Sequence, residues 1–234
     1  MNIWNMKKQV LLLVAATALV ACTGTPRQGR LQEERRLLTG FERIEQMGAI
    51  DVKYRQADSC SVVVKAPKKM LRQVETRVED GRLLLNMRGY GKLVNFARGE
   101  GDDVTVYVTS PDLIGIALRG SGDFDAKGPV DTDTLSIELR GSGDIDFADV
   151  ICNEARVSLV GSGDVELEKL VARTTRIELV GSGDMKARLE SSGPVEAMLT
   201  GSGDIKLAGH IESLRRQVRG SGSVNTKGLT INKH

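Results

Sequence analysis

The sequence predicts an all-β protein whose C-terminal half is a β-solenoid, a stack of short coils built from parallel strand. Three observations predict it: the tetrapeptide Gly-Ser-Gly-Asp recurs at a nearly constant spacing, apolar and polar residues alternate within the repeats, and the residues two positions before and directly after each motif are apolar. A fixed period near twenty residues is typical of repeat proteins in which each unit packs on its neighbours.

The motif first occurs at Gly120. Further copies begin at residues 141, 161, 181 and 201, and a variant, Gly-Ser-Gly-Ser, begins at residue 220. From Leu135 to Phe147 every odd-numbered residue is apolar or glycine and every even-numbered residue is polar. A period of two indicates a strand with one buried face, and the two glycines allow that strand to bend at the motif.

Stacking the repeats in register aligns two columns of apolar side chains. The column two positions before the motif is Leu118, Leu139, Leu159, Leu179, Leu199 and Val218. The column directly after the motif is Phe124, Ile145, Val165, Met185, Ile205 and Val224. Each such side chain contributes ~1.5–3 kcal/mol when fully buried, so we expect these columns to form one continuous core.

The segment before the repeats predicts a smaller β module. Strands are expected at residues 49–54, 60–64, 82–87 and 104–108, a hairpin turn at Asp80-Gly81, at least one helical turn within 67–78 and a loop at 89–103. The expected organisation is therefore an N-terminal β module of residues 40–112 that caps a solenoid of residues 113–228.

The first residues have the features of an export signal. Lys7 and Lys8 precede an apolar run at 10–20, which is about half the length of a membrane span. Leu19-Val20-Ala21-Cys22 resembles the bacterial lipobox, which predicts a signal peptide of residues 1–21 and a lipid on Cys22 that holds the chain to a membrane. Because Thr23 follows instead of aspartate, the outer membrane is the expected location, with the periplasmic and the outer surface both open.

Residues 22–39 are polar and predict a flexible tether, with a short helix at 31–38 as an alternative. Removing residues 1–21 takes away two lysines and no acid, so the 33 basic residues become 31 and balance the 31 acidic ones. This balance argues against nucleic acid as a partner. Cys60 and Cys152 share no spacing motif; separate thiols are favoured, and a disulfide between them is the alternative.

The motif places carboxylates and hydroxyls in two outward columns. Carboxylates on neighbouring coils, ~4.8 Å apart, repel each other by about 0.9 kcal/mol per pair in water, so a favourable interaction must offset this repulsion. Either each aspartate accepts hydrogen bonds from the amides of its own bend, or an acidic strip binds calcium, the sole cofactor considered. The calcium candidates are Asp123, Asp125, Asp144, Asp146, Asp164 and Glu166. A repeat-face binding surface would use Ser121, Ser142, Ser162, Ser182 and Ser202 with Asp184 and Asp204.

An enzyme is not expected. Gly-Ser-Gly lacks the Gly-Lys-Ser/Thr of a phosphate-binding loop, and repeated rungs do not give carboxylates the differing environments of an acid–base pair. The one tryptophan, Trp4, lies in the signal, so the mature chain lacks this common sugar-stacking residue.

Several segments resemble the head-GIN-domain family of adhesin-like envelope proteins. They are the entry Gly40 to Ile44, Ile50-Asp51-Val52, the turn from Val78 to Leu83, the lead-in from Val106 to Leu113 and the motif array, covering about Phe41 to Lys227. The resemblance implies an exported lipoprotein with a right-handed parallel β-helix and no established activity.

We therefore expect a non-catalytic, adhesin-like binding or scaffolding lipoprotein whose partner is a glycan or an envelope protein. A polysaccharide-active or glycan-binding β-helix, with or without calcium, is the alternative. The last rung offers free strand edges through which copies could associate.

Overall fold

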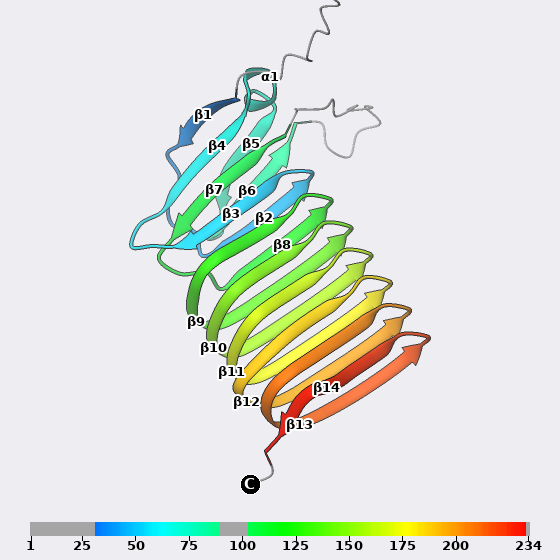
Figure 1. Ribbon diagram of the computed structural model, residues 1–234. Coiled ribbons are helices and arrows are strands. Elements are labelled where there is room, and N and C mark those ends of the chain that lie inside the picture. The colour runs from blue at the N-terminus through cyan, green and yellow to red at the C-terminus, as the bar shows by residue number, and fades with distance from the viewer. Residues whose placement is uncertain (1–30, 89–102, 233–234) are drawn as a thin grey trace, which may run out of the picture.

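The computed structural model describes residues 31–88 and 103–232 (Figure 1). These residues form one 14-stranded sheet and one short helix. No helix in the described ranges is long and apolar enough to cross a membrane. The predicted signal peptide, Cys22, the part of the predicted tether before Leu31 and residues 89–102 of the predicted loop lie outside these ranges.

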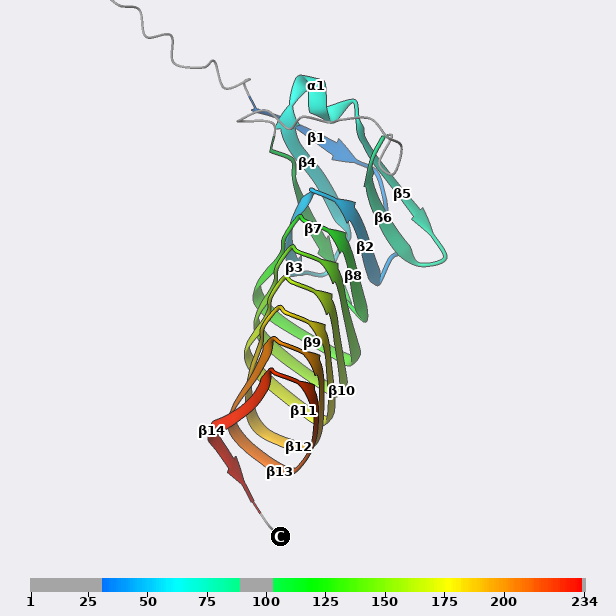
Figure 2. The same cartoon turned by 90° about the vertical axis from the view of Figure 1, so that its right-hand side faces the viewer.

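The C-terminal half is the predicted β-solenoid. Each coil is one long strand that bends around the common axis, as Figure 2 shows in a view turned from that of Figure 1. Neighbouring coils pair in parallel, and Leu139, Leu159 and Leu179 lie opposite one another in the register. The coils are β9 (Phe124–Gly141), β10 (Ile145–Gly161), β11 (Val165–Gly181), β12 (Met185–Gly201) and β13 (Asp204–Gly220).

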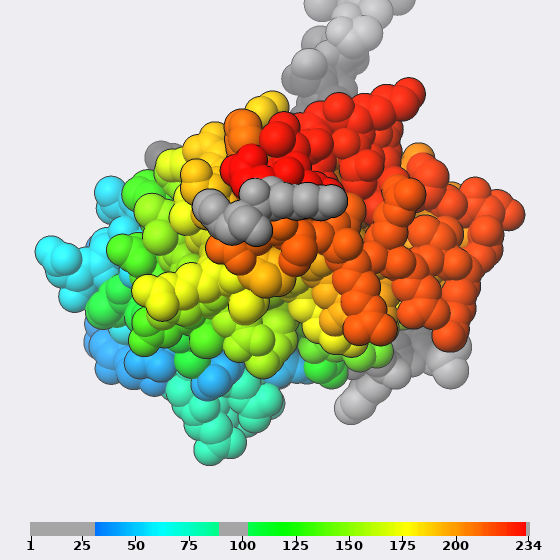
Figure 3. Space-filling model, turned by 90° about the horizontal axis from the view of Figure 1, so that it is seen from below, coloured from blue at the N-terminus to red at the C-terminus, as the bar shows by residue number. Residues whose placement is uncertain are grey.

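The predicted core columns are buried. Leu118 through Leu199 in the first column and all six residues of the second column belong to the buried core. Val218, the last member of the first column, is instead 42% exposed. The reason is that β14 (Ser223–Ile231) pairs with Asp204–Ile211 of β13 and leaves the stretch after it uncovered. Figure 3 views this end of the molecule, where β13 and β14 form the surface.

The N-terminal strands continue the solenoid. Strand β2 (Arg43–Gly48) pairs in parallel with β8 (Gly115–Gly120), and β3 (Asp51–Gln56) pairs in parallel with β9, so β2 and β3 form a first coil. Beyond β3 the sheet continues through β7 (Thr105–Ser110), β4 (Ser61–Pro67) and β1 (Leu31–Arg36). Beyond β2 it continues through β6 (Arg82–Met87) and β5 (Val74–Glu79). The core is therefore continuous from one end to the other.

Strand β1 corrects the prediction for the end of the tether. Leu31–Arg36, expected as tether or short helix, pairs antiparallel with β4 from Leu31 opposite Pro67 to Arg36 opposite Val62. The edge of β4 offers unpaired backbone groups, and pairing with them outweighs the helix propensity of the Leu, Gln, Glu and Arg residues in this segment. The ion pair between Lys65 and Glu33, 3.4 Å apart, adds to the pairing.

Two further local predictions are confirmed. The helical turn is α1 (Lys68–Leu71), and the hairpin between β5 and β6 turns at Asp80 and Gly81, whose φ angles are 51° and 70°. Such positive values are those that Asp-Gly favours in a two-residue hairpin.

Both cysteines are free thiols, Cys60 partly buried and Cys152 buried, as favoured from the sequence. Burial raises the pKa of the Cys152 thiol to about 11.

Candidate functional site

The Gly-Ser-Gly motifs form one corner of every coil. At each corner a glycine carbonyl of one coil accepts two hydrogen bonds from the next. Gly120 accepts from the N–H groups of Ser142 and Gly143 at 3.0 and 3.3 Å, and the same pair of bonds recurs along the stack. The corner therefore holds neighbouring coils together through the main chain.

Close backbone approach explains both glycines of the motif. The first has a left-handed backbone, with φ of +145° at Gly141. The second has no room for a side chain, because a Cβ atom on Gly143 would lie 2.0 Å from the carbonyl oxygen of Gly122. The glycines are thus a requirement of stacking, which agrees with the rejection of a phosphate-binding loop.

The motif aspartates form a ladder along the same corner. The Asp164 N–H donates to Oδ1 of Asp144 at 3.0 Å, and the Asp184 N–H donates to Oδ1 of Asp164 at 2.9 Å. The Asp144 and Asp204 amides donate in the same way, each at 3.1 Å, to Asp123 and Asp184. The prediction that each aspartate binds the amides of its own bend is therefore wrong: the acceptor and the amide belong to successive coils.

Two members of this ladder were missed from the sequence. Gly48-Ala49-Ile50-Asp51 takes the place of a motif, because Gly48 lies opposite Gly120 and Oδ1 of Asp51 accepts from the Asp123 N–H at 3.2 Å. The signal that could have revealed it is a glycine three residues before an aspartate that starts a strand. At the other end, Ser223 donates its N–H and its Oγ–H to Oδ1 of Asp204 at 3.0 and 2.8 Å. These bonds lower the pKa of Asp204.

Beside the ladder, the predicted acidic strip is divided by lysines. Asp125 pairs with Lys53 at 2.9 Å, and Glu166 pairs with Lys186 at 3.2 Å. Asp146 lies between these two carboxylates in the register. Its pKa is raised by partial burial first and then by the negative charges around it.

The calcium candidates thus have other partners at most positions. Asp123, Asp144 and Asp164 accept amides, while Asp125 and Glu166 bind lysines. Within residues 31–88 and 103–232 no group of three His, Cys, Asp or Glu is placed to hold a metal ion. Calcium binding stays a prediction.

The motif serines lie on the outside of the corner. All five serines of the predicted face are exposed: Ser121, Ser142, Ser162, Ser182 and Ser202. The structure therefore brings the serine and aspartate columns to one edge, where the ladder fixes the aspartates and the hydroxyls face solvent.

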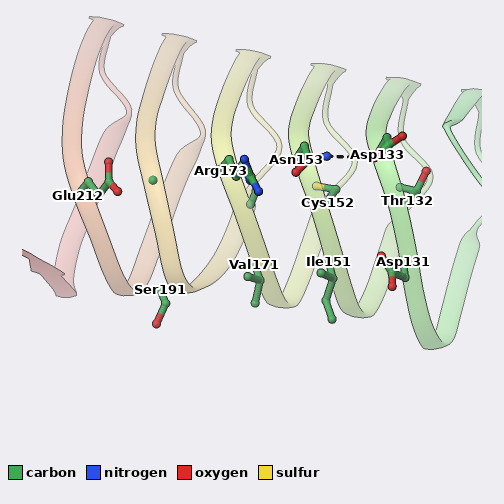
Figure 4. A pocket seen from close by; sticks show the side chains of 12 residues that line it. Asp131, Thr132, Asp133, Ile151, Cys152, Asn153, Val171, Arg173, Ser191 and Glu212 are labelled. Carbon is green, nitrogen blue, oxygen red and sulfur yellow. Dashed lines mark hydrogen bonds between the residues drawn. The ribbon is translucent and has the colours of Figure 1, made fainter.

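A groove of about 650 Å³ crosses β9 to β13 on another part of the coils (Figure 4). Its apolar residues include Ile151, which is 42% exposed, and Val171. Its polar residues include Asp131, Asn153 and Arg173. Sequence reasoning missed this groove because its residues lie in the part of the coil that differs from repeat to repeat.

Next to this groove, the Ser192 side chain replaces backbone hydrogen bonds that are missing between the paired strands β11 and β12. The register shifts between Leu170 and Thr175. The buried Ser192 hydroxyl donates to the Leu170 carbonyl at 3.1 Å and accepts from the Ala172 N–H at 3.2 Å. One side chain thus satisfies a backbone donor and a backbone acceptor at the irregularity.

Solved structures share this fold. A crystal structure described as a putative adhesin from Bacteroides fragilis has a TM-score of 0.68 and 23% identity, covering 84% of this chain and 96% of that one. One described as a putative lipid binding protein from Parabacteroides distasonis has a TM-score of 0.64 and 19% identity, with the same coverage. One described as a putative adhesin from Parabacteroides merdae has a TM-score of 0.53 and 18% identity, again with the same coverage.

These likenesses are below 25% identity and show the fold alone. No curated protein matches the chain. The family described as "Putative auto-transporter adhesin, head GIN domain" matches residues 40–228, from the first coil through most of the last strand. The chain therefore belongs to this head-GIN-domain family, as the motif array and its lead-in segments indicated.

Proposed function

We propose that the protein is a non-catalytic binding module of the cell envelope that presents its serine and aspartate edge to a repetitive partner, such as a glycan. The observation that carries the proposal is the ladder, which uses one oxygen of each motif aspartate and leaves a straight file of exposed serines ~4.8 Å apart. A rigid file of like groups suits a ligand that repeats its own contacts.

The environments of the motif aspartates support a role without catalysis. Acid–base chemistry on a glycan needs two carboxyl groups with different environments. Asp144 and Asp164 instead make the same hydrogen bond, each to the amide of the next coil. A polysaccharide-degrading role would regain support if a glycan were cleaved and the cleavage were lost in Asp144→Asn and Asp164→Asn.

A glycan array with the purified domain tests the binding proposal. The variant Ser142→Ala/Ser162→Ala/Ser182→Ala removes three exposed hydroxyls without touching the ladder. It should keep the wild-type melting temperature and lose at least tenfold in affinity for any glycan that the wild type selects. A wild type without a selective signal would favour a pure scaffold, and unchanged affinity in the triple variant would remove the serines from the site.

We further propose that Cys22 carries the lipid anchor and that the outer membrane is the location. The support is the segment Leu19-Val20-Ala21-Cys22 together with membership of an adhesin-like family. Metabolic labelling with an alkyne fatty acid should mark the wild type and leave Cys22→Ala unlabelled. Protease treatment of intact cells then tells whether the solenoid faces outward, since a protein inside the periplasm would be protected.

We also propose that Asp146 binds calcium. It is the residue of the acidic strip that has no lysine or amide partner in the described structure. A melting temperature that rises in millimolar calcium and falls with chelator, and that loses this response in Asp146→Asn, would support it. An unmoved melting temperature would remove it.

A further inference from the structure

A second candidate site lies at the N-terminal end of the molecule, on the outer face of the sheet formed by β4, β7, β3 and β9. It is a groove of about 490 Å³. Its lining includes Arg55 from β3, Tyr107 from β7 and Lys127 from β9, with Ser61 and Thr109 among the polar neighbours. The groove is therefore built on strands, which hold the positions of its side chains.

Tyr107 gives the groove an exposed aromatic ring. Its exposed fraction is 44%, whereas Phe41, Tyr54, Phe124 and Phe147 are buried, so among the tyrosines and phenylalanines of the described ranges it is the one open to solvent. Register places Tyr107 between Val63 on one side and Lys53 on the other. An aromatic face beside aliphatic atoms suits the apolar C–H face of a sugar ring, while the phenol hydroxyl remains free to hydrogen-bond.

The charge of the groove is positive. Lys53 and Lys127 share one carboxylate, that of Asp125, at 2.9 and 3.5 Å. Arg55 is exposed, and no carboxylate lies within ion-pair distance of it in the part of the chain that the structure describes. Among the side chains that line the groove, three cations and one anion give a formal charge of +2, while Asp51 and Asp123 act on Lys53 from outside the lining.

Arg55 lies one strand across and two residues along from Tyr107, since Arg55 is opposite Thr109 in the parallel pair. With strands ~4.8 Å apart and a rise of ~3.3 Å per residue, the two Cα atoms are about 8 Å apart. A planar guanidinium binds a planar carboxylate through two parallel hydrogen bonds, which a lysine cannot do. One sugar residue on Tyr107 would thus place a carboxylate on its ring within reach of Arg55.

We propose that this groove binds a polysaccharide containing uronic acid, with Tyr107 stacking on the sugar ring and Arg55 binding its carboxylate. The site does not depend on the serine and aspartate edge: its residues come from β3, β4, β7 and β9, and none is a motif serine. Binding at one site can therefore be lost while binding at the other is kept.

Titration calorimetry with oligogalacturonate, with a neutral galactose oligomer as the parallel ligand, tests the proposal. The acidic oligomer should bind and the neutral one should bind at least tenfold more weakly. Arg55→Ala should weaken binding about tenfold and Arg55→Lys about threefold, because the lysine keeps the charge and loses the fork. Tyr107→Ala should weaken it about fivefold, while Tyr107→Phe, which keeps the ring, should stay within twofold.

Arg188→Ala is the matched control, because Arg188 is an exposed arginine that lines a different groove on β12. It should leave binding unchanged, and so should the triple serine variant. Equal losses in Arg55→Ala and Arg188→Ala would reduce the effect to general charge attraction and overturn the proposal. So would equal binding of both oligomers, absence of binding, or binding that is matched by vesicles of anionic phospholipid. Each variant is first checked for an unchanged melting temperature.

Discussion

The ladder of aspartates makes a prediction in which two substitutions at one residue have opposite signs. Asp164 accepts the Asp184 N–H at 2.9 Å and donates its own N–H to Asp144 at 3.0 Å. Asp164→Ala removes the acceptor and leaves the Asp184 amide without its partner. A side-chain oxygen that accepts a backbone N–H at a helix N-cap contributes about 1 kcal/mol, and we expect a similar loss of unfolding free energy here.

Asp164→Asn keeps an oxygen at the same place and removes the charge. Each neighbouring carboxylate, one coil away at ~4.8 Å, repels the wild-type charge by about 0.9 kcal/mol before salt screening. Lys186 attracts Asp164 and offsets part of this repulsion. With two neighbouring carboxylates and a screening length of about 8–10 Å, the variant should be more stable than the wild type by roughly 0.5 kcal/mol, and more so at low salt.

Urea unfolding of the three proteins at 20 and 300 mM salt measures these differences. Asp164→Ala should lie below the wild type at both salt concentrations and Asp164→Asn above it, with the larger gain at 20 mM. If Asp164→Asn loses as much stability as Asp164→Ala, the carboxylate charge itself is needed, as it would be for a bound cation, and the hydrogen-bond explanation fails.

Four other predictions concern single residues. Gly163→Ala should cost about 3 kcal/mol or more, or prevent folding, because its Cβ would lie 2.0 Å from the Gly143 carbonyl oxygen; Ser162→Ala beside it should stay within about 0.5 kcal/mol in the same urea assay. Asp146→Asn should raise stability at pH 7 in a pH series of melts. The raised pKa of Asp146 means that the folded wild type loses stability as pH rises from the ordinary value of 3.8 through the raised one, so the gain should vanish below that ordinary value. Thr175→Val should stabilise by about 1 kcal/mol in urea, because the buried Oγ1 has no partner among the described protein atoms; a loss would show that the hydroxyl is satisfied in solution. Arg216→Leu should self-associate more strongly than the wild type as its concentration rises, because it removes a charged side chain from the uncovered edge of β13; sedimentation coefficients equal to those of the wild type at every concentration would count against this explanation.

The solenoid was predictable because its constraints recur at a fixed spacing. Leu139, Leu159 and Leu179 are buried as expected, since a side chain repeated every coil has the same surroundings every time. The partners of the motif aspartates were not predictable in the same way. Whether Asp144 binds the amide of its own bend or that of the next coil depends on how the corners overlap, and this follows from the stacked backbone.

The unpredicted elements are those that occur once. Gly48 to Asp51 forms a corner without the serine and second glycine, because Ile50 belongs to the first coil and, among the described residues, no earlier corner carbonyl lies against it from the other side. The hydrogen bonds of Ser192 depend on a register shift between β11 and β12, which is visible only once the strands are paired. The groove at Tyr107 combines strands that are distant in sequence, so its composition depends on the topology of β3, β4, β7 and β9.

The end of the repeat array also follows from the physics of stacking. In the core column that contains Ile137, Val157 and Ile177, the last coil has Arg216, whose Nη1 donates to the Val224 carbonyl at 3.3 Å. A charged side chain at an inward position makes the uncovered edge of β13 unfavourable for another strand. At the start of β14, Ser223 stands where each earlier coil has the aspartate, so the ladder ends without a carboxylate for a further amide. The stack therefore ends at two changes of residue type: Arg216 stands where the earlier coils have an apolar side chain, and Ser223 stands where they have an aspartate. At this end β14 leaves Val218 exposed.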